Sequence, residues 1–271
     1  MALVPFPGPQ SGALQRPPES EEDEGPGAAD RMSFLEHLDE LRKRIISCCL
    51  WIAVGVVVAF AFHQQLYDFI LGPTRRALPA GSRLIYTTPG EAFSLHIQIA
   101  LISGIVLAAP FIMYQVWRFI APALYAHEKK LAIPFVLLST AGLVAGAAFN
   151  HFWLFPYMVL FFGSFNSPDL RFLPALDPVW SLYTNFLIAM GITFQLPTLV
   201  YFLARMRLVS AGFLARQFKY AVLIIFIIAA VVTPTGDPGT QTLFAAPMIA
   251  LYVLSIGIAW IVGPRGKGKS D

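Results

Sequence analysis

The sequence has little charge, few cysteines and, beyond its first forty residues, very little acid. Only 13% of its 271 residues are charged, whereas 56% are hydrophobic and the mean hydropathy is +0.64. Soluble domains carry about 25% charged residues. Nine of the sixteen acids precede residue 41, and the bases cluster beside apolar runs. This composition excludes the soluble globular class and predicts a membrane protein with no nucleic-acid partner.

Sequence signatures of catalysis and of metal binding are also missing. There is no HExxH, GxSxG or CxxC, and the five histidines do not fall at ligand spacing. Cys48 and Cys49 are adjacent in an apolar run, where they read as small buried hydrophobes. The stretch GPRGKGKS, residues 263–270, fits a P-loop pattern but follows a membrane span rather than a strand. We therefore expect no enzymatic activity, no catalytic residue, no cofactor and no metal.

Long uncharged runs predict an all-α membrane protein with six transmembrane helices. Such runs exceed the roughly 18 residues that mark a spanning helix. They also lack the alternating apolar and polar residues that mark the strands of a membrane barrel. The expected spans are residues 45–62, 92–115, 131–156, 179–204, 220–233 and 243–262. Gly142 and Gly146 give a GxxxG spacing that predicts close helix packing, and Pro247 is expected to shorten the regular part of the sixth span.

The chain outside the spans divides into tails and loops. Residues 1–31, rich in Pro, Gly and acid, are expected to be a disordered tail before a transmembrane domain at 32–263, with Met32 as an alternative start. Residues 264–271 are expected to be a basic cytoplasmic tail near anionic lipid. The outer connections, 63–91 and 157–178, are rich in Pro, Gly and aromatics and are expected to fold as structured caps.

The distribution of Lys and Arg predicts that both termini are cytoplasmic. Counting alternate connections with the N-terminus inside gives fifteen bases on the inner side and four on the outer side. An excess of Lys and Arg marks cytoplasmic loops. The four outer bases are Arg75, Arg76, Arg83 and Arg171.

The segment FLEHLDELRKR, residues 34–44, concentrates charge just before the first span. Ser33 and Glu36 fit a capping box, which predicts a helix start, and an apolar stripe predicts an amphipathic helix along the inner surface. Asp39 and Lys43 form an i,i+4 pair, as do Glu40 and Arg44. The segment is either only a salt-bridged interfacial helix or part of a binding site. The second interpretation arises because acidic residues are unusual at the cytoplasmic edge of the membrane, which is otherwise basic.

Two further polar residues stand out, and each has two readings. Glu128 is the only acid in the inner loop after the second span, where it either pairs with its neighbouring lysines or forms a binding site. Gln195, in GITFQLPT, is the most central polar residue of the spans. It either ties two helices together by a hydrogen bond or serves function directly.

Four stretches together resemble the TatC family, the multi-span subunit of the twin-arginine (Sec-independent) protein translocase. The resemblance runs from Met32 to about Val262 and rests on FLEHLDELRKR, APFIMYQVWRFIAPALYAHEKK, GITFQLPT and TPTGDPGTQTLFAAP. It implies a receptor in the bacterial inner membrane that binds Arg-Arg signal peptides of folded proteins at the cytoplasmic face. It also implies an oligomeric complex with single-span TatA-type and TatB-type partners, driven by the proton-motive force.

The resemblance also implies roles for individual residues. It assigns signal-peptide binding to Glu40, Leu41, Arg42, Arg44, Phe119 and Glu128. It assigns structural or partner-helix roles to Pro73, Pro110, Gln195, Thr233, Asp237 and Gln241. Where many relatives have a buried glutamate in the fourth span, this chain has Gln195, which keeps hydrogen bonding but cannot titrate.

An alternative reading is a small-solute secondary transporter with a midplane polar site near Gln195 and His96. The spans contain no full charge, and no internal repeat is visible. Both absences disfavour this reading.

Overall fold

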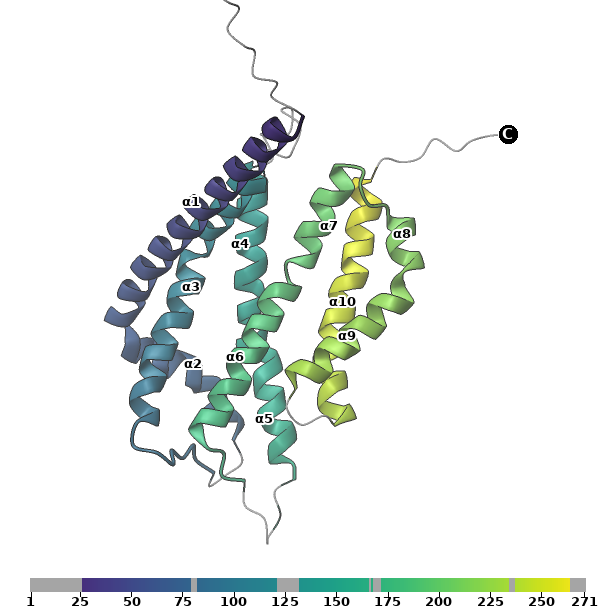
Figure 1. Ribbon diagram of the computed structural model, residues 1–271. Coiled ribbons are helices and arrows are strands. Elements are labelled where there is room, and N and C mark those ends of the chain that lie inside the picture. Colours follow the sequence, from purple (N-terminus) through teal and green to yellow (C-terminus); the bar gives the residue numbers. More distant parts are fainter. Residues whose placement is uncertain are drawn as a thin grey trace, which may run out of the picture. The chain divides into compact units, whose positions relative to one another are not determined.

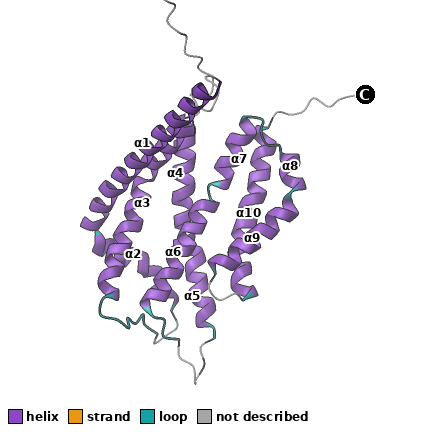
Figure 2. Ribbon diagram, in the orientation of Figure 1, coloured by secondary structure: helices purple, strands orange, loops and turns teal. Residues whose placement is uncertain are grey.

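The computed structural model of the protein is helical almost throughout the part of the chain that it describes (Figure 2). It describes residues 26–78, 82–120, 132–165, 167, 172–233 and 237–263, without the side chains of residues 26–35, 120 and 132. The chain up to Lys43 and the chain from Arg44 form two compact units. The expected tails at 1–25 and 264–271, and Glu128, lie outside the described residues.

The first helix, α1 (Pro26–Ala61), begins earlier than the sequence analysis predicts. The helix already includes residues 26–31, which we assigned to the tail. Ser33 therefore lies inside the helix and cannot act as the N-cap of a capping box, because an N-cap residue has non-helical backbone angles. The prediction of a helix start at Ser33 is wrong, whereas the helix itself and its entry into the first span are confirmed.

The unit from Arg44 contains the remaining helices, which Figure 1 labels. They are α2 (His63–Ala77), α3 (Glu91–Ile120), α4 (Ala132–Phe149), the π-helical turn η3 (Asn150–Leu154), α5 (Phe155–Gly163), α6 (Leu176–Thr193), α7 (Leu196–Arg205), α8 (Ala211–Arg216), α9 (Phe218–Val232) and α10 (Pro238–Val262). Within this unit α4 packs against α3 and α6, and α10 packs against α7, α8 and α9.

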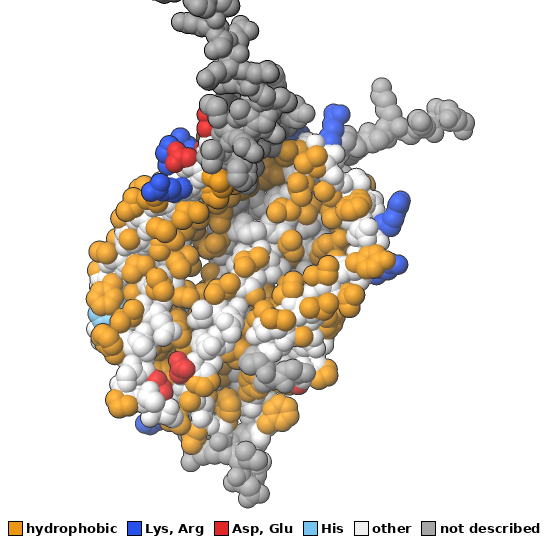
Figure 3. Space-filling model, in the orientation of Figure 1, with side chains coloured by type: hydrophobic (Ala, Val, Ile, Leu, Met, Phe, Trp, Pro, Cys, Tyr) orange, Lys and Arg blue, Asp and Glu red, His pale blue; other side chains and the backbone are white. Residues whose placement is uncertain are grey.

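Five helical stretches of the described chain are long and apolar enough to cross a membrane, and α9 is a shorter apolar helix. The five are Glu36–Ala61, Glu91–Phe119, Ile133–Gly163, Leu176–Arg205 and Pro238–Val262. With α9 they match the six predicted spans. Hydrophobic side chains cover much of the face drawn in Figure 3, as expected of a surface in contact with lipid.

Prolines in these helices interrupt them less than we predict. The third span does not end at Pro156 but continues through α5 to Gly163. The π-helical turn η3 precedes Pro156, which therefore falls in the first turn of α5. The missing backbone N–H of a proline costs little stability at this position of a helix. Pro247 lies inside α10, which runs unbroken over 25 residues. The expectation that Pro247 shortens the regular part of the sixth span is wrong.

The described parts of the two outer connections are structured, as predicted. Residues 63–77 form α2, which packs against α3 and α5. The Leu176 N–H donates to the carbonyl of Ile85, at 2.7 Å, and the Ile85 N–H donates to the carbonyl of Pro174, at 3.1 Å. These two bonds form a parallel β-bridge between Ile85 and Ala175, which joins one outer connection to the other.

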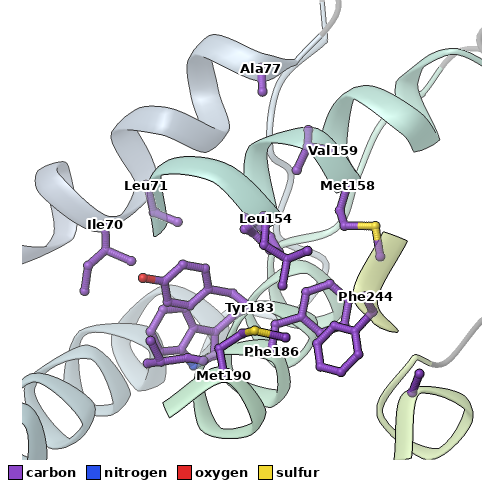
Figure 4. Packing of buried hydrophobic residues seen from close by; sticks show 14 of the residues in the cluster. Ile70, Leu71, Ala77, Leu154, Met158, Val159, Tyr183, Phe186, Met190 and Phe244 are labelled. Carbon is purple, nitrogen blue, oxygen red and sulfur yellow. The ribbon is translucent and has the colours of Figure 1, made fainter. Parts of the chain in front are cut away.

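The core of the larger unit lies where α2, η3, α5, α6 and α10 meet (Figure 4). Met190 and Phe186 of α6 are fully buried, and the Phe186 ring lies 4.9 Å from that of Phe244 on α10. Two glycines of α4 permit the close approach of α6. A Cβ at Gly142 would lie 2.9 Å from the carbonyl oxygen of Phe194, and one at Gly146 would lie 2.8 Å from that of Met190. The predicted GxxxG contact is confirmed.

Candidate functional site

The charged segment before the first span is the first part of the candidate site. Within the unit up to Lys43, Arg42 is exposed, whereas Glu40 and Leu41 are half-buried. The Lys43 ammonium lies 2.7 Å from the Asp39 carboxylate, which confirms the predicted i,i+4 ion pair. Both partners are more than half exposed, so the pair contributes little to stability. Its main effect is on local charge, because the Asp39 carboxylate partly neutralises the Lys43 ammonium.

Arg44 begins the larger unit and fixes the first span to the second. Its Nη1 donates to Oε1 of Gln115, at 3.3 Å, and Gln115 is only 8% exposed. Phe119 is half-buried one helical turn beyond Gln115 on α3. Residues four apart share one face of a helix, so Gln115 and Phe119 lie on the same face of α3. Two predicted site residues, Arg44 and Phe119, therefore lie near one end of α3.

An aromatic cluster that the sequence analysis missed holds this end of α3 in place. Trp117, 5% exposed, has its ring centroid 5.1 Å from that of Phe135 on α4 and 6.1 Å from that of Phe202 on α7. The rings of Phe135 and Phe202 are 5.0 Å apart. Such tilted ring pairs add about 0.5–1.5 kcal/mol each beyond their buried area. The cluster holds the end of α3 that precedes Glu128 in the sequence.

Gln195 lies at the joint between α6 and α7. Its Nε2 donates to the carbonyl of Ser139 on α4, at 2.9 Å. This bond confirms the reading of Gln195 as a tie between helices. Gln195 also contributes to the lining of a cavity of about 280 Å³, whose other described side chains are apolar. His96 is not among those residues. A polar midplane site that combines Gln195 with His96, as the solute-transporter alternative requires, is therefore not favoured.

Three predicted partner-helix residues stabilise the hairpin of α9 and α10. The Gln241 amide donates to the carbonyl of Phe226, at 2.8 Å, across the two helices. The Thr233 hydroxyl, 2% exposed, donates to the carbonyl of Ala229. Asp237 is the N-cap of α10 and accepts from the Thr240 N–H, at 2.7 Å.

The two predicted prolines lie in helices. Pro73 is inside α2 and Pro110 is inside α3, and both are half-buried. The described residues contain no group of three or more His, Cys, Asp or Glu that could hold a metal ion.

Comparisons with known proteins agree on one family. The sequence model of the family described as Sec-independent protein translocase protein (TatC) matches residues 36–247. The TatC protein of Koribacter versatilis is 41% identical over 243 residues, covering 88% of this chain and 89% of that protein. That of Desulforapulum autotrophicum is 37% identical over 240 residues, covering 89% and 87%.

Solved structures give the same result for the fold. A crystal structure of the twin arginine translocase receptor TatC superposes with a TM-score of 0.72 at 34% identity, covering 82% of this chain and 97% of that one. A second crystal structure of this receptor, in the detergent DDM, gives the same TM-score at 32% identity.

Proposed function

Because this chain belongs to the TatC family of Sec-independent protein translocase proteins, we propose that its cytoplasmic face binds the Arg-Arg motif of signal peptides. The protein is a multi-pass protein of the bacterial inner membrane and a non-enzymatic subunit of a protein translocase. The family match carries the proposal, since it spans residues 36–247 and so includes both acids of the proposed site, Glu40 and Glu128.

The chemistry of the two acids supports this assignment. Arg presents a planar, permanently charged fork that can bind a carboxylate through two parallel hydrogen bonds, whereas Lys is a compact point charge. Each charge-assisted hydrogen bond contributes on the order of 1.5–3 kcal/mol. Glu128 is the only acid of its inner connection, and Glu40 is followed by three bases at residues 42–44, so each offers a carboxylate beside bases. Two such carboxylates can prefer Arg-Arg to Lys-Lys without any catalysis.

Neighbouring residues complete the proposed site. Phe119 and Leu41 supply apolar surface for the hydrophobic part of the signal peptide, and Arg42 and Arg44 orient the middle of α1. Arg44 does so through its hydrogen bond to Gln115 on α3.

We place the docking of single-span TatA-type and TatB-type partners along α9. This helix has only 15 residues, about 22 Å, against an apolar bilayer core of about 30 Å. Its outward face is apolar, and Val231 is 81% exposed. Thr233 and Gln241 hold α9 and α10 in the arrangement that such partners would meet. The assembled translocase then uses the proton-motive force to export folded cargo.

The site assignment is tested by reversing the two charges. We expect Glu40→Lys combined with Glu128→Lys to abolish crosslinking of an Arg-Arg signal peptide, because each new ammonium repels the incoming guanidinium. Asp39→Lys is the matched control, since it makes the same charge change one residue away from Glu40 and disturbs only an exposed ion pair. It should crosslink as the wild type does. Membrane insertion of all variants is checked by protease accessibility. Undiminished crosslinking in an inserted double variant would refute the assignment.

A further inference from the structure

The connection between α7 and α9 carries concentrated positive charge. Arg205, Arg207, Arg216 and Lys219 fall within 15 residues, and all four are exposed. No acidic residue occurs between Asp177 and Asp237. No acid of this stretch therefore neutralises the four bases. In Figure 3, Lys and Arg side chains gather around α8 and the start of α9.

The backbone of this basic connection, residues 205–219, is held in place by hydrogen bonds and packing. Ser210 caps α8 by accepting from the Phe213 N–H, at 3.2 Å. The Tyr252 hydroxyl of α10 donates to the carbonyl of Leu214, at 3.0 Å. The Leu214 side chain is buried in a small cluster with Val200, Ala204 and Ala259. The connection is therefore anchored to α7 and α10, and its bases are presented from a defined backbone.

Arg207 occupies a backbone position that normally selects glycine. Its φ is +61°, and no other non-glycine residue of the described chain has a positive φ. The Arg207 N–H donates to the carbonyl of Ala204, at 3.0 Å, and the Leu208 N–H donates to that of Leu203, at 2.9 Å. These two bonds form a Schellman motif, whose left-handed position is most often glycine. An arginine here gives up backbone stability, which points to a use for its side chain.

Apolar side chains alternate with these bases. Leu208 is 65% exposed and Phe213 is 54% exposed. The Lys219 ammonium lies 4.9 Å from the Tyr220 ring centre. Exposed apolar groups interleaved with cations are typical of a segment that lies at the membrane interface, with its apolar groups in the acyl region and its charges at the headgroups.

We propose that residues 205–219 bind anionic phospholipid headgroups of the cytoplasmic leaflet. The excess of Lys and Arg places this connection on the cytoplasmic side, where the anionic surface potential attracts basic segments. Guanidinium groups bind phosphate through paired hydrogen bonds. This binding is separate from that of signal peptides and does not depend on Glu40 or Glu128.

The test is lipid retention by the purified full-length chain. The protein is titrated with mixed micelles of phosphatidylglycerol or of phosphatidylcholine, and retained lipid is counted by native mass spectrometry. The wild-type protein should retain phosphatidylglycerol in preference to phosphatidylcholine. Arg207→Gly combined with Arg216→Gln should lower phosphatidylglycerol association, by about fivefold for each charge removed. Phosphatidylcholine retention should not change.

Two variants separate lipid binding from folding. Arg207→Gly alone suits the left-handed position, so its melting temperature should equal or exceed that of wild type while phosphatidylglycerol retention falls. Arg83→Gln removes the same charge from the predicted outer side and should retain lipid as wild type does. If the Arg207→Gly, Arg216→Gln variant kept full phosphatidylglycerol retention, or wild type held phosphatidylcholine equally well, the proposal would be overturned. If the Arg207→Gly, Arg216→Gln variant kept its phosphatidylglycerol but no longer co-purified with an acidic protein partner, the bases would serve protein docking. That result would also overturn the proposal.

Discussion

At the scale of single residues, three glutamines hold the helices of the larger unit together. Gln115 accepts from Arg44, Gln195 donates to the carbonyl of Ser139, and Gln241 donates to the carbonyl of Phe226. In lipid, an amide has no water to bond with, so a polar side chain inside a span finds a partner on a neighbouring helix. The sequence singles out Gln195 as a polar residue in an apolar span, and the resemblance to the TatC family singles out Gln241. It does not reveal their partners, because those lie far along the chain.

Gln195→Ala should lower stability and weaken partner assembly. The substitution removes the interhelical donor to the Ser139 carbonyl, and interhelical hydrogen bonds in membranes contribute about 0.6–1.7 kcal/mol. Thermal unfolding in detergent should show a lower melting temperature, and co-purification of partner subunits should fall more than signal-peptide binding does. Gln65→Ala, at an exposed position of α2, is the control and should change neither quantity. Unchanged co-purification of partners by Gln195→Ala would count against this role.

At the scale of elements, the sequence predicts where helices are far better than where they end. Apolar runs alone locate all six spans, because each must cross the hydrocarbon core. Their ends are wrong by up to nine residues, since the first span begins at Glu36 and not at residue 45. The end of the third span is wrong by seven residues, because composition does not show that a π-helical turn can absorb Pro156. The helical contacts beyond the spans, such as that of α2 with α5, depend on tertiary packing that no local pattern encodes.

The crossing of α1 and α3 is one such contact, and it can be tested by a single methyl group. A Cβ at Gly104 would lie 2.5 Å from the backbone nitrogen of Val56 and 2.6 Å from its Cα, so Gly104→Ala forces the two helices apart. We expect a loss of about 1–3 kcal/mol, measured by thermal unfolding in detergent. Gly257→Ala makes the same change in α10, where nothing lies within 4 Å of the added Cβ, and should be neutral or slightly stabilising. Equal melting temperatures for the two variants would contradict the close crossing.

At the scale of the whole molecule, charge distribution and apolar runs predict class and topology. Fifteen bases against four decide the orientation, since cytoplasmic loops carry the excess of Lys and Arg. The candidate site cannot be predicted in this way. Spacing shows that Glu40 and Glu128 are unusual acids at a basic edge, but only resemblance to the TatC family connects them to one ligand. The packing around Trp117, which holds the end of α3 that precedes Glu128 in the sequence, follows from contacts among three helices.

The central claim is that this protein discriminates arginine pairs by carboxylate recognition at its cytoplasmic face. The most direct measurement is capture of the full-length protein by an immobilised signal peptide with Arg-Arg, compared with a twin peptide in which both arginines are lysine. We predict strong capture by Arg-Arg and at least tenfold weaker capture by Lys-Lys, since losing one charge-assisted hydrogen bond costs on the order of 1.5–3 kcal/mol. Equal capture by the two peptides would contradict the account.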